Sequence, residues 1–315
     1  MSGPSEGVEE RGGGGGALWW AALQEGPGVG ASTMLRLARV FGSAEAAANA
    51  SVEELVCRGG VSERQASELR RAAESVQVLR RRIEGWRAQG IELLTMEEEA
   101  YPAGLRDLQS PPPLLYVRGR LERDDARAVA VVGTREPDRA GARCGRRIAR
   151  ELAARGFTIV SGLARGIDTA GHEGALEEGR TAAVLGCGLL RIYPPENARL
   201  AGRIARRGAL VAEVPPDTQV ERRVLLARDR IQAALSRAVI VVQAHRQCGS
   251  IVTAEHAVRC GRLLYGVPWS EPPFSEGWAR LREMGARDLH AEASVDEVAA
   301  EVEGWQREAE QRELM

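Results

Sequence analysis

Residues 128–135 read Ala-Val-Ala-Val-Val-Gly-Thr-Arg, a short apolar run that ends in a glycine, a hydroxyl and an arginine. An apolar run of this length, bounded by a turn signal, predicts a strand that is buried on both faces. A second such stretch is Phe157 to Val160, which leads into Ser161 and Gly162. Between the two, Gly141 to Arg155 has the apolar spacing of a helix. Strand, helix and strand in this order predict a parallel βαβ unit.

The same alternation continues to about residue 290. The further predicted strands are Thr181–Leu185, Ala209–Ala212, Val239–Val242 and Leu263–Val267, and the further predicted helices are Thr169–Glu178, Ala198–Arg207, Leu225–Ser236 and Thr253–Arg259. Apolar strands that alternate with helices indicate a parallel sheet covered on both faces. Because parallel crossovers are right-handed, residues 126–290 are predicted to form a doubly wound, Rossmann-like α/β domain. Residues 291–315 are predicted to add one amphipathic helix, about Ser294 to Trp305, and a charged tail.

The segment before this domain has a different composition and a different pattern of apolar residues. Residues 1–16 are rich in Gly and Glu without apolar periodicity, which predicts a disordered tail. Residues 17–95 show helical spacing and no strand-like alternation, so they are predicted to form a small all-helical domain. Its turn at residues 26–30, Gly-Pro-Gly-Val-Gly, fits either a helix-hairpin-helix hairpin that binds phosphates through amides or a plain helix break. Residues 96–125 contain several prolines and are predicted to be a turn-rich connector.

The composition restricts the possible partners. The 315 residues are 44% hydrophobic, and all 43 Lys-or-Arg positions are arginine, against 44 acidic residues. A net charge of −1 argues against a uniformly basic nucleic-acid binder, so any DNA site has to be a local patch. Only 4% of the residues are aromatic, which argues against extended base-stacking platforms. Five cysteines without a CxxC pair, no apolar run long enough for a membrane span and no secretory signal predict a cytoplasmic protein.

Four predicted strand ends carry small or anion-binding residues. They are Gly133-Thr134-Arg135, Ser161 to Gly166, Gly186-Cys187-Gly188 and Cys248-Gly249-Ser250. Glycine lets backbone N–H groups approach an anion closely, and hydroxyls and helix N-termini add donors. Tight strand-to-helix turns also need glycine, so a single loop of this kind is weak support. Because the carboxyl ends of parallel strands meet at one edge of the sheet, four such loops predict an anion-binding crevice.

The loops also indicate which anion is bound. A dinucleotide fold has GxGxxG after its first strand and an acidic residue at the end of its second strand. Here the first strand runs into Gly133-Thr134-Arg135 and the second ends in Ser161. The GxxxxGK[ST] motif of a P-loop is absent as well. Phosphates held by hydroxyls, amides and arginine, without a metal or cofactor, favour a nucleic-acid backbone as the ligand.

Longer motifs connect these loops to a known family. In chain order they are Tyr101-Pro102, PPLLYVRG at Pro112–Gly119, VVGTR at Val131–Arg135, SGLARGID at Ser161–Asp168 with His172, Tyr193-Pro194 with Asn197, Arg228 with Arg230, and Gly249-Ser250 with Thr253. From about Ala17 to Ala286 the sequence resembles the DprA/Smf family. The resemblance implies a non-enzymatic protein that binds and protects incoming single-stranded DNA, forms a homodimer and loads the RecA recombinase in natural transformation and recombination. It also implies that the N-terminal helices are similar to a SAM or helix-hairpin-helix module.

The loops and the resemblance together define a predicted DNA-binding set. Its members are Gly133, Thr134, Arg135, Ser161, Gly162, Arg165, Gly186, Gly188, Arg228, Arg230, Gly249, Ser250 and Thr253. Paired arginines on one rim are able to clamp successive phosphates. No catalytic residue, metal ligand or cofactor is predicted.

The last third of the chain departs from the family pattern. The family's RNR motif has Asp229 at its centre here, and Cys248 replaces the first serine of the usual SGS. Leu225-Leu226 stands for Phe-Pro, Trp269 for the glycine of VPG, and Gly277-Trp278-Ala279 for Gly-x-Asn. In the family, this part of the chain completes the pocket and contributes to dimerisation.

Several residues admit a second interpretation. Arg228 and Arg230 also suit internal ion pairs with Asp229 or Glu221. Asp168 and His172, four residues apart, suit a helix cap and a packing contact better than acid–base chemistry, and Cys187 suits a core position. His245, Cys248, His256 and Cys260 are zinc-ligand types, but a strand-to-helix switch separates the two pairs, so no zinc is predicted. Two other functions stay open: a small-nucleotide-binding or nucleotide-hydrolysing protein, and a structural partner protein.

Overall fold

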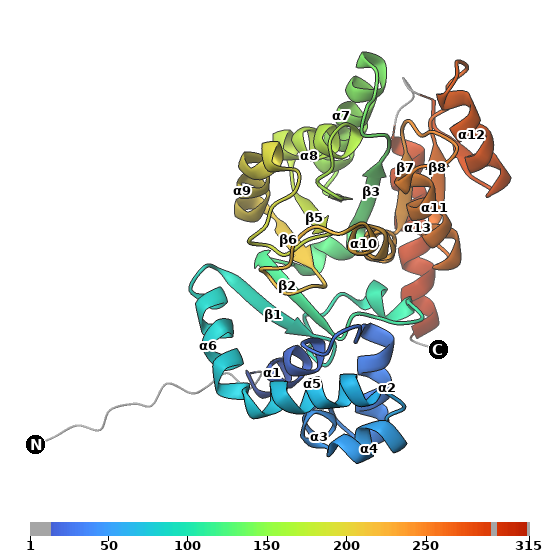
Figure 1. Ribbon diagram of the computed structural model, residues 1–315. Coiled ribbons are helices and arrows are strands. Elements are labelled where there is room, and N and C mark those ends of the chain that lie inside the picture. Colours follow the sequence, from blue (N-terminus) through green and yellow to red (C-terminus); the bar gives the residue numbers. More distant parts are fainter. Residues whose placement is uncertain (1–13, 291–294, 314–315) are drawn as a thin grey trace, which may run out of the picture.

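A nine-stranded sheet runs through the described part of the molecule in the order β1-β2-β6-β5-β4-β3-β7-β8-β9 (Figure 1). The structure is a computed structural model that describes residues 14–290 and 295–313. The strands are β1 Ile91–Thr95, β2 Leu114–Gly119, β3 Ala128–Val132, β4 Thr158–Ser161, β5 Thr181–Leu185, β6 Ala209–Ala212, β7 Ala238–Val241, β8 Leu263–Gly266 and β9 Arg287–Asp288. From β6 to β9 neighbouring strands pair in parallel, whereas β2 pairs antiparallel with both β6 and β1. The Rossmann-like parallel sheet is therefore confirmed, with an antiparallel extension at one edge.

Helices cover both faces of the sheet and fill the N-terminal part. They are α1 Gly14–Gln24, α2 Ala31–Phe41, α3 Ala44–Asn49, α4 Val52–Cys57, α5 Glu63–Glu74, α6 Val76–Arg87, α7 Arg139–Ala154, α8 Ile167–Glu178, α9 Ala198–Arg207, α10 Arg222–Leu235, α11 Gly249–Arg259, α12 Phe274–Glu283 and α13 Asp296–Glu313, with short 3-10 turns η1 Ala103–Asp107, η2 Arg123–Arg127 and η3 Pro195–Asn197. The alternation of strands and helices from residue 128 to 267 follows the sequence prediction within a few residues. The later helix α12 was not predicted.

Three predictions about the ends and the connector are wrong. Gly14–Gly16 belong to α1, so the predicted disordered tail does not extend to residue 16; its first 13 residues lie outside the described residues. Ile91–Thr95, placed in the all-helical segment, forms strand β1, and the turn-rich connector contains β2. These two strands have only five and six residues, and β1 begins four residues after the end of α6, which also contains Leu and Ile. Sequence periodicity therefore had too few residues to distinguish strand from helix there.

The alternating side chains of the parallel strands explain the two covered faces. In β3, Val129 and Val131 pack in one core with Ile148 of α7, whereas Ala130 and Val132 pack in another core with Ile231 of α10. All five β3 side chains are buried. Because successive strand residues point to opposite faces, this continuous apolar run requires helices on both sides of the sheet. The α7 face also receives α8 and α13, and the α10 face receives α11 and α12.

The N-terminal helices share a core with the antiparallel edge of the sheet. Figure 1 shows α1–α6 gathered beside β1 and β2. Trp86 of α6 stacks edge-on against Tyr116 of β2, with ring centroids 5.6 Å apart, and the Tyr116 hydroxyl donates to Gln24 of α1. Leu114, Leu210 and Ile204 belong to the same buried cluster as the helical core. The helices are therefore fixed against the sheet by apolar packing and not only by a linker.

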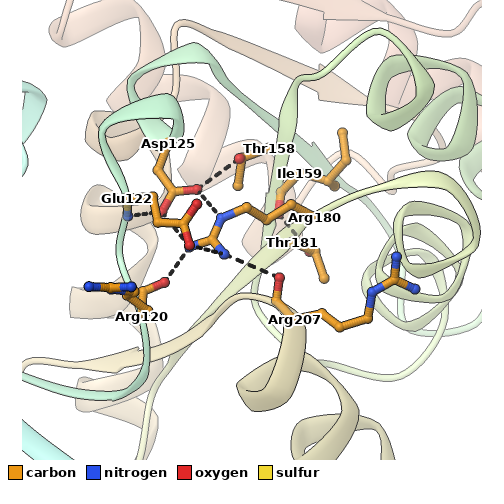
Figure 2. A network of polar contacts seen from close by, with 8 residues as sticks. All are labelled: Arg120, Glu122, Asp125, Thr158, Ile159, Arg180, Thr181 and Arg207. Carbon is orange, nitrogen blue, oxygen red and sulfur yellow. Dashed lines mark hydrogen bonds and ion pairs between the residues drawn. The ribbon is translucent and has the colours of Figure 1, made fainter.

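The connector is held at the amino edge of the parallel strands by Arg180 (Figure 2). Its Nε lies 2.8 Å from Asp125 Oδ1, and its guanidinium also donates to the carbonyl of Arg207 and pairs with Glu122. The Thr158 hydroxyl donates to Asp125 at 2.8 Å. A half-buried network with several partners is more rigid than an isolated surface pair. It lies at the edge of the sheet opposite the predicted crevice.

Candidate nucleic-acid interface

A crevice of about 640 Å³ lies at the carboxyl edge of the sheet, at the point where the strand order reverses. The chain adds β4, β5 and β6 on one side of β3 and then adds β7 and β8 on its other side. The loop after β3 and the start of α11, which follows β7, form two walls of the crevice, and α10 forms a third. In open α/β sheets, ligands bind at such a reversal, outside the carboxyl ends of the strands.

The rim of the crevice carries two exposed arginines, Arg135 after β3 and Arg222 at the start of α10. Within residues 14–290 and 295–313, neither guanidinium forms an ion pair with a carboxylate. The neighbouring Arg223 differs, because its Nε lies 2.6 Å from Glu221. Arg135 and Arg222 are thus available to an anion without first breaking an internal pair.

The N-terminus of α11 opens into the same crevice. Cys248 occupies the N-cap position, and its side chain makes no capping hydrogen bond to the helix. Gly249 and Ser250 line the crevice at this end, and the Ser250 hydroxyl lies 2.9 Å from Cys248 Sγ. Uncapped N–H groups and the positive end of the helix dipole form a binding site for an anion.

One wall offers apolar and aromatic surface. Tyr193 is 40% exposed and Leu226 is 42% exposed, although both are large hydrophobic side chains. Both line the crevice, with Leu225 beside them. An exposed aromatic ring next to free arginines suits an unpaired base that stacks while its phosphates are held.

Arg228 of α10 lies below the rim and is only 6% exposed. Its Nη1 donates to the carbonyl of Val184 at 3.1 Å, and its Nε lies 3.2 Å from Asp229 Oδ1 without hydrogen-bond geometry. The Arg228 Nε and the Gln232 Nε2 are buried donors that form no hydrogen bond among the described residues. Both residues line the crevice, so a bound ligand is able to satisfy donors that are otherwise costly to bury.

Two buried carboxylates flank Arg228. The pKa of Asp229 is raised to about 6, chiefly by burial and also by the nearby Asp168, against the opposing effects of Arg228 and Arg135. Burial also raises the pKa of Asp168, against the effect of Arg228. Asp168 accepts the N–H groups of Gly162 and Ala164 at 3.1 and 3.3 Å, so it fixes the loop after β4. The floor of the crevice therefore contains negative charge that changes with pH.

Comparison with known proteins decides the family. The family model described as DNA recombination-mediator protein A matches residues 92–302. The chain belongs to this family. Protein Smf of Synechocystis is 41% identical over 208 residues, which cover 64% of this chain and 52% of that protein. DNA processing protein DprA of Bacillus subtilis is 34% identical over 222 residues, which cover 70% of this chain and 75% of that protein. The chain thus spans about half the length of the Synechocystis relative and three quarters of the B. subtilis one.

Two solved structures share the fold. DNA processing protein A of Streptococcus pneumoniae superposes with a TM-score of 0.76 at 28% identity, covering 87% of this chain and 94% of that one. The DNA processing protein A of Helicobacter pylori superposes with a TM-score of 0.60 at 30% identity, covering 67% of this chain and 95% of that one. The description of the H. pylori structure refers to its single-stranded DNA binding mode.

In this member of the DNA recombination-mediator protein A family, the structure brings together only part of the predicted DNA-binding set. Gly133, Thr134, Arg135, Arg228, Gly249, Ser250 and Thr253 line the crevice. Gly162 and Arg165 border a small adjoining pocket that also contains Arg135 and Tyr193. Arg165 is 63% exposed but forms an ion pair with Glu196. A Cβ on Gly162 would lie 1.4 Å from Arg228 Nη1, so the glycine leaves space for that guanidinium.

Four predicted residues do not reach the crevice. Ser161 is fully buried, and its hydroxyl donates to the carbonyl of Val131 at 2.7 Å. Arg230 points away from Arg228, because residues two apart on a helix lie on different faces, and it binds Glu213 and the carbonyl of Ser110. Gly186 packs against Leu225 and Gly188 packs against the backbone of Pro215–Pro216. For these two glycines, close packing explains the residue type without a ligand.

Gly188 permits a direct test of this structural role. A Cβ at this position would lie 2.3 Å from the carbonyl oxygen of Pro216, which is backbone and unable to move freely. Gly188→Ala should therefore lower the free energy of unfolding by about 1–3 kcal/mol, the usual cost of overpacking. Urea unfolding measures this loss. The affinity of the folded variant for a crevice ligand should stay within about twofold of the wild type, and a selective loss of affinity at unchanged stability would contradict the packing role.

Some crevice residues were not in the predicted set. Arg222, Tyr193 and Gln232 line it from the start of α10, the loop after β5 and the middle of α10. None of them follows a strand directly, so the rule that directs attention to strand ends does not find them. Only the aromatic residue in the family motif Tyr193-Pro194 gave a usable signal in the sequence.

His172 fits the packing interpretation given above. His172 is fully buried, its Nδ1 lies 2.7 Å from the Thr181 hydroxyl, and burial lowers its pKa to about 3. A neutral, enclosed imidazole of this kind suits packing. In the part of the chain that the structure describes, no group of three or more His, Cys, Asp or Glu side chains is arranged to hold a metal ion. Over the same residues, no helix is both long and apolar enough to cross a membrane.

Proposed function

We propose that this protein binds single-stranded DNA in the crevice between β3 and β7 and acts as a non-enzymatic recombination mediator. The relatives named DNA processing protein DprA and the single-stranded DNA binding mode of the H. pylori protein support the ligand class. The observation that carries the proposal is the composition of the rim. Arg135 and Arg222, which form no ion pair among the described residues, line the same crevice as the N-terminus of α11 and the exposed Tyr193. Phosphates bind to the first two features, and an unpaired base stacks on the third.

Salt-dependent binding tests this proposal. The full chain is titrated against a fluorescent single-stranded oligonucleotide at several salt concentrations, with a duplex of equal length as competitor. We expect the logarithm of the binding constant to fall linearly with the logarithm of the salt concentration, because each phosphate contact releases counterions. The duplex should compete poorly, because its bases are stacked internally and do not reach Tyr193. The absence of salt-sensitive binding would refute the proposal.

Tyr193→Ala should weaken binding of single-stranded DNA by about 5–150-fold, equivalent to the 1–3 kcal/mol of one base-stacking contact. The side chain is 40% exposed, so its removal should leave the stability nearly unchanged. Fluorescence anisotropy with thymine and abasic oligonucleotides measures the effect. A Tyr193→Phe variant keeps the ring and should retain most of the affinity. Equal losses in both variants would argue against stacking.

Three more specific properties are part of this proposal. We infer that the protein forms a homodimer, protects incoming single-stranded DNA in the cytoplasm and loads the RecA recombinase onto it during natural transformation. Light scattering of the free protein tests the dimer. RecA filament formation on DNA coated with single-strand-binding protein, with and without this chain, tests the loading. No acceleration of filament formation would limit the function to DNA binding.

A small nucleotide is the alternative ligand. The crevice volume of about 640 Å³ lies in the range of small-molecule sites, and the carboxyl of Asp229 is unusual for a pocket that binds only phosphates. A purified sample that retains absorbance at 260 nm on size exclusion would favour a nucleotide. A nucleotide-free sample that binds single-stranded DNA would favour the DNA function.

A further inference from the structure

Five arginines form a stripe on the solvent side of α7, outside the crevice. They are Arg139, Arg143, Arg146, Arg147 and Arg150. Their spacing of four, seven, eight and eleven residues from Arg139 places them on one face of a helix, opposite the buried residues Ile148 and Leu152. At 1.5 Å per residue, the 16 residues of α7 extend for about 24 Å. The stripe therefore covers most of the length of one exposed helix.

A tryptophan borders the stripe. A groove of about 540 Å³ is lined by Arg143, Arg146, Arg147 and Arg150 together with Ala140, Cys144, Glu177 of α8 and Trp269 from the loop after β8. The Trp269 side chain is partly exposed, and its Nε1 donates to the carbonyl of Val242 at 2.5 Å, which fixes the indole beside α7. Arginine beside an aromatic ring is the combination that holds single-stranded nucleic acid.

Carboxylates neutralise only part of the stripe. Arg146 pairs with Glu173 and Glu177, and Arg150 lies 3.9 Å from Glu177. Arg147 pairs with Glu151 at 2.8 Å. Arg139 and Arg143 form no ion pair within the residues that the structure describes, although Arg143 helps to lower the pKa of Asp138. The unpaired positive charge thus lies at the start of α7, the end that is nearer to the crevice loop.

The arginines at the start of α7 destabilise this helix when no ligand is bound. Cations near a helix N-terminus oppose the helix dipole, and like charges four residues apart repel each other. The first turn of α7 contains no acidic residue, although Asp138 caps it by accepting the N–H of Gly141. An arrangement that is locally unfavourable without a ligand becomes favourable when phosphates lie along it. The stripe is therefore better explained by a bound polyanion than by helix stability.

The stripe is continuous with the crevice. The crevice loop after β3 leads directly into α7 through residues 136–138. Gln243 ties the two together, because its backbone carbonyl accepts the N–H of Thr134 and its side-chain oxygen accepts the N–H of Asp138 at 3.3 Å. The carbonyl that holds Trp269 belongs to the adjacent Val242. The crevice, the start of α7 and Trp269 are thus fixed to one short segment after β7.

We propose that the α7 stripe and Trp269 form a second contact surface for single-stranded DNA, a track that binds the strand after it leaves the crevice. This inference rests on the function proposed above and specifies its ligand as a strand longer than the crevice can hold. Arg139 and Arg143 bind phosphates, and Trp269 stacks on a base. The track gives the protein a higher affinity for long strands than for short ones.

The experiment compares two oligonucleotide lengths. Wild type and the double variant Arg139→Gln/Arg143→Gln are titrated with single strands of about 6 and about 30 nucleotides. The matched control is Arg80→Gln/Arg81→Gln on α6, which removes the same charge from exposed arginines; Figure 1 shows α6 beside β1, well away from α7. We expect the α7 variant to lose about 5–20-fold in affinity for the long strand and less than about twofold for the short one, with a salt slope about 1.4 lower for the long strand. The α6 control should match the wild type.

Each outcome separates this inference from the proposed function. If wild type binds the short strand and binds the long one no better, the track is absent and the crevice function stands. If the α7 and α6 variants lose the same amount of affinity for the long strand, the loss is caused by the change in net charge and the track is refuted. If wild type binds neither strand, both proposals fail. If the α7 variant changes the mass of the free protein in light scattering, the stripe is an interface between copies and not a track.

Two further readouts exclude a merely structural role. Quenching of tryptophan fluorescence by the long strand should be largely lost in Trp269→Phe, whereas the short strand should cause little quenching in either protein, because no tryptophan lines the crevice among the described residues. The Arg139→Gln/Arg143→Gln variant should be at least as thermally stable as the wild type, because it removes repulsion at the start of α7. A lower melting temperature together with weaker binding of both lengths would overturn the proposal.

Discussion

Asp229→Asn should increase the affinity for single-stranded DNA at pH 7.5 by about tenfold, equivalent to about 1.4 kcal/mol. Asp229 lines the crevice next to Arg228, and its carboxyl is 8% exposed. With a pKa of about 6 it is ionised at pH 7.5 and repels a phosphate bound in the crevice. Asparagine has almost the same shape without the charge. Fluorescence anisotropy at constant ionic strength measures the gain.

The same substitution should remove the pH dependence of binding. In the wild type, the affinity should rise as the pH falls from 7.5 to 5.5, because Asp229 takes up a proton on passing about pH 6. In Asp229→Asn the affinity should stay nearly constant over this range. The matched control is Asp288→Asn, an exposed position in β9 that should behave like the wild type. A variant whose affinity still changes with pH as the wild type does would show that another group is responsible.

The pH dependence of the free energy of unfolding tests the raised pKa of Asp229 independently of DNA binding. Its pKa is raised in the folded state above the ordinary value of 3.8, so the folded protein binds the proton more tightly than the unfolded chain. The stability from this group is therefore greatest below about pH 4 and falls as the pH rises through about 6. Asp229→Asn should raise the free energy of unfolding on the order of 1–2 kcal/mol at pH 7.5, less than the full shift implies because Arg228 loses a partner. The gain should vanish near pH 4 in urea unfolding.

The sequence was sufficient to predict the parallel sheet because both of its faces are buried. A strand such as β3 has to be apolar at every position, and few other structures require this pattern. The antiparallel edge lacks that constraint. β1 has Glu92 on its solvent side, and its five residues follow α6 after only residues 88–90, so the run is too short to show a strand period. The pairing of β2 with β6 joins residues about 100 positions apart, and no local pattern predicts it.

The position of the crevice could be predicted because it follows from the order of the strands. The sequence identified only some of the residues that line it. Strand order determines where loops meet, so Arg135 and Ser250 were found from their positions after strands. A glycine at a strand end has two causes, ligand approach and close packing, and only the contacts of Gly186 and Gly188 distinguish them. Arg228 and Arg230 look equivalent in sequence, yet the helix directs them to opposite sides.

The double variant Arg135→Ala/Arg222→Ala should lose about 100-fold or more in affinity for single-stranded DNA of any sequence. Each guanidinium is exposed on the rim and forms no ion pair among the described residues, so its interaction with a phosphate needs no prior rearrangement. Charge-assisted hydrogen bonds contribute about 1.5–3 kcal/mol each. The slope of log affinity against log salt should fall by about 1.4, since two phosphate contacts on a single strand are lost. Stability should change little, because both side chains are exposed.

Substitution of Arg135 and Arg222 should also affect stability differently from substitution of the buried Arg228. This difference identifies the rim as the binding surface. Arg228→Met leaves Asp168 and Asp229 buried without their cation, so it should destabilise the protein by about 3–5 kcal/mol in addition to weakening binding. The rim variants lose affinity alone. Circular dichroism melts and anisotropy titrations on the same samples separate the two effects. Rim variants that bind DNA as tightly as the wild type, with an unchanged salt slope, would remove the crevice as the DNA site, because no phosphate would then depend on the free cations at its entrance.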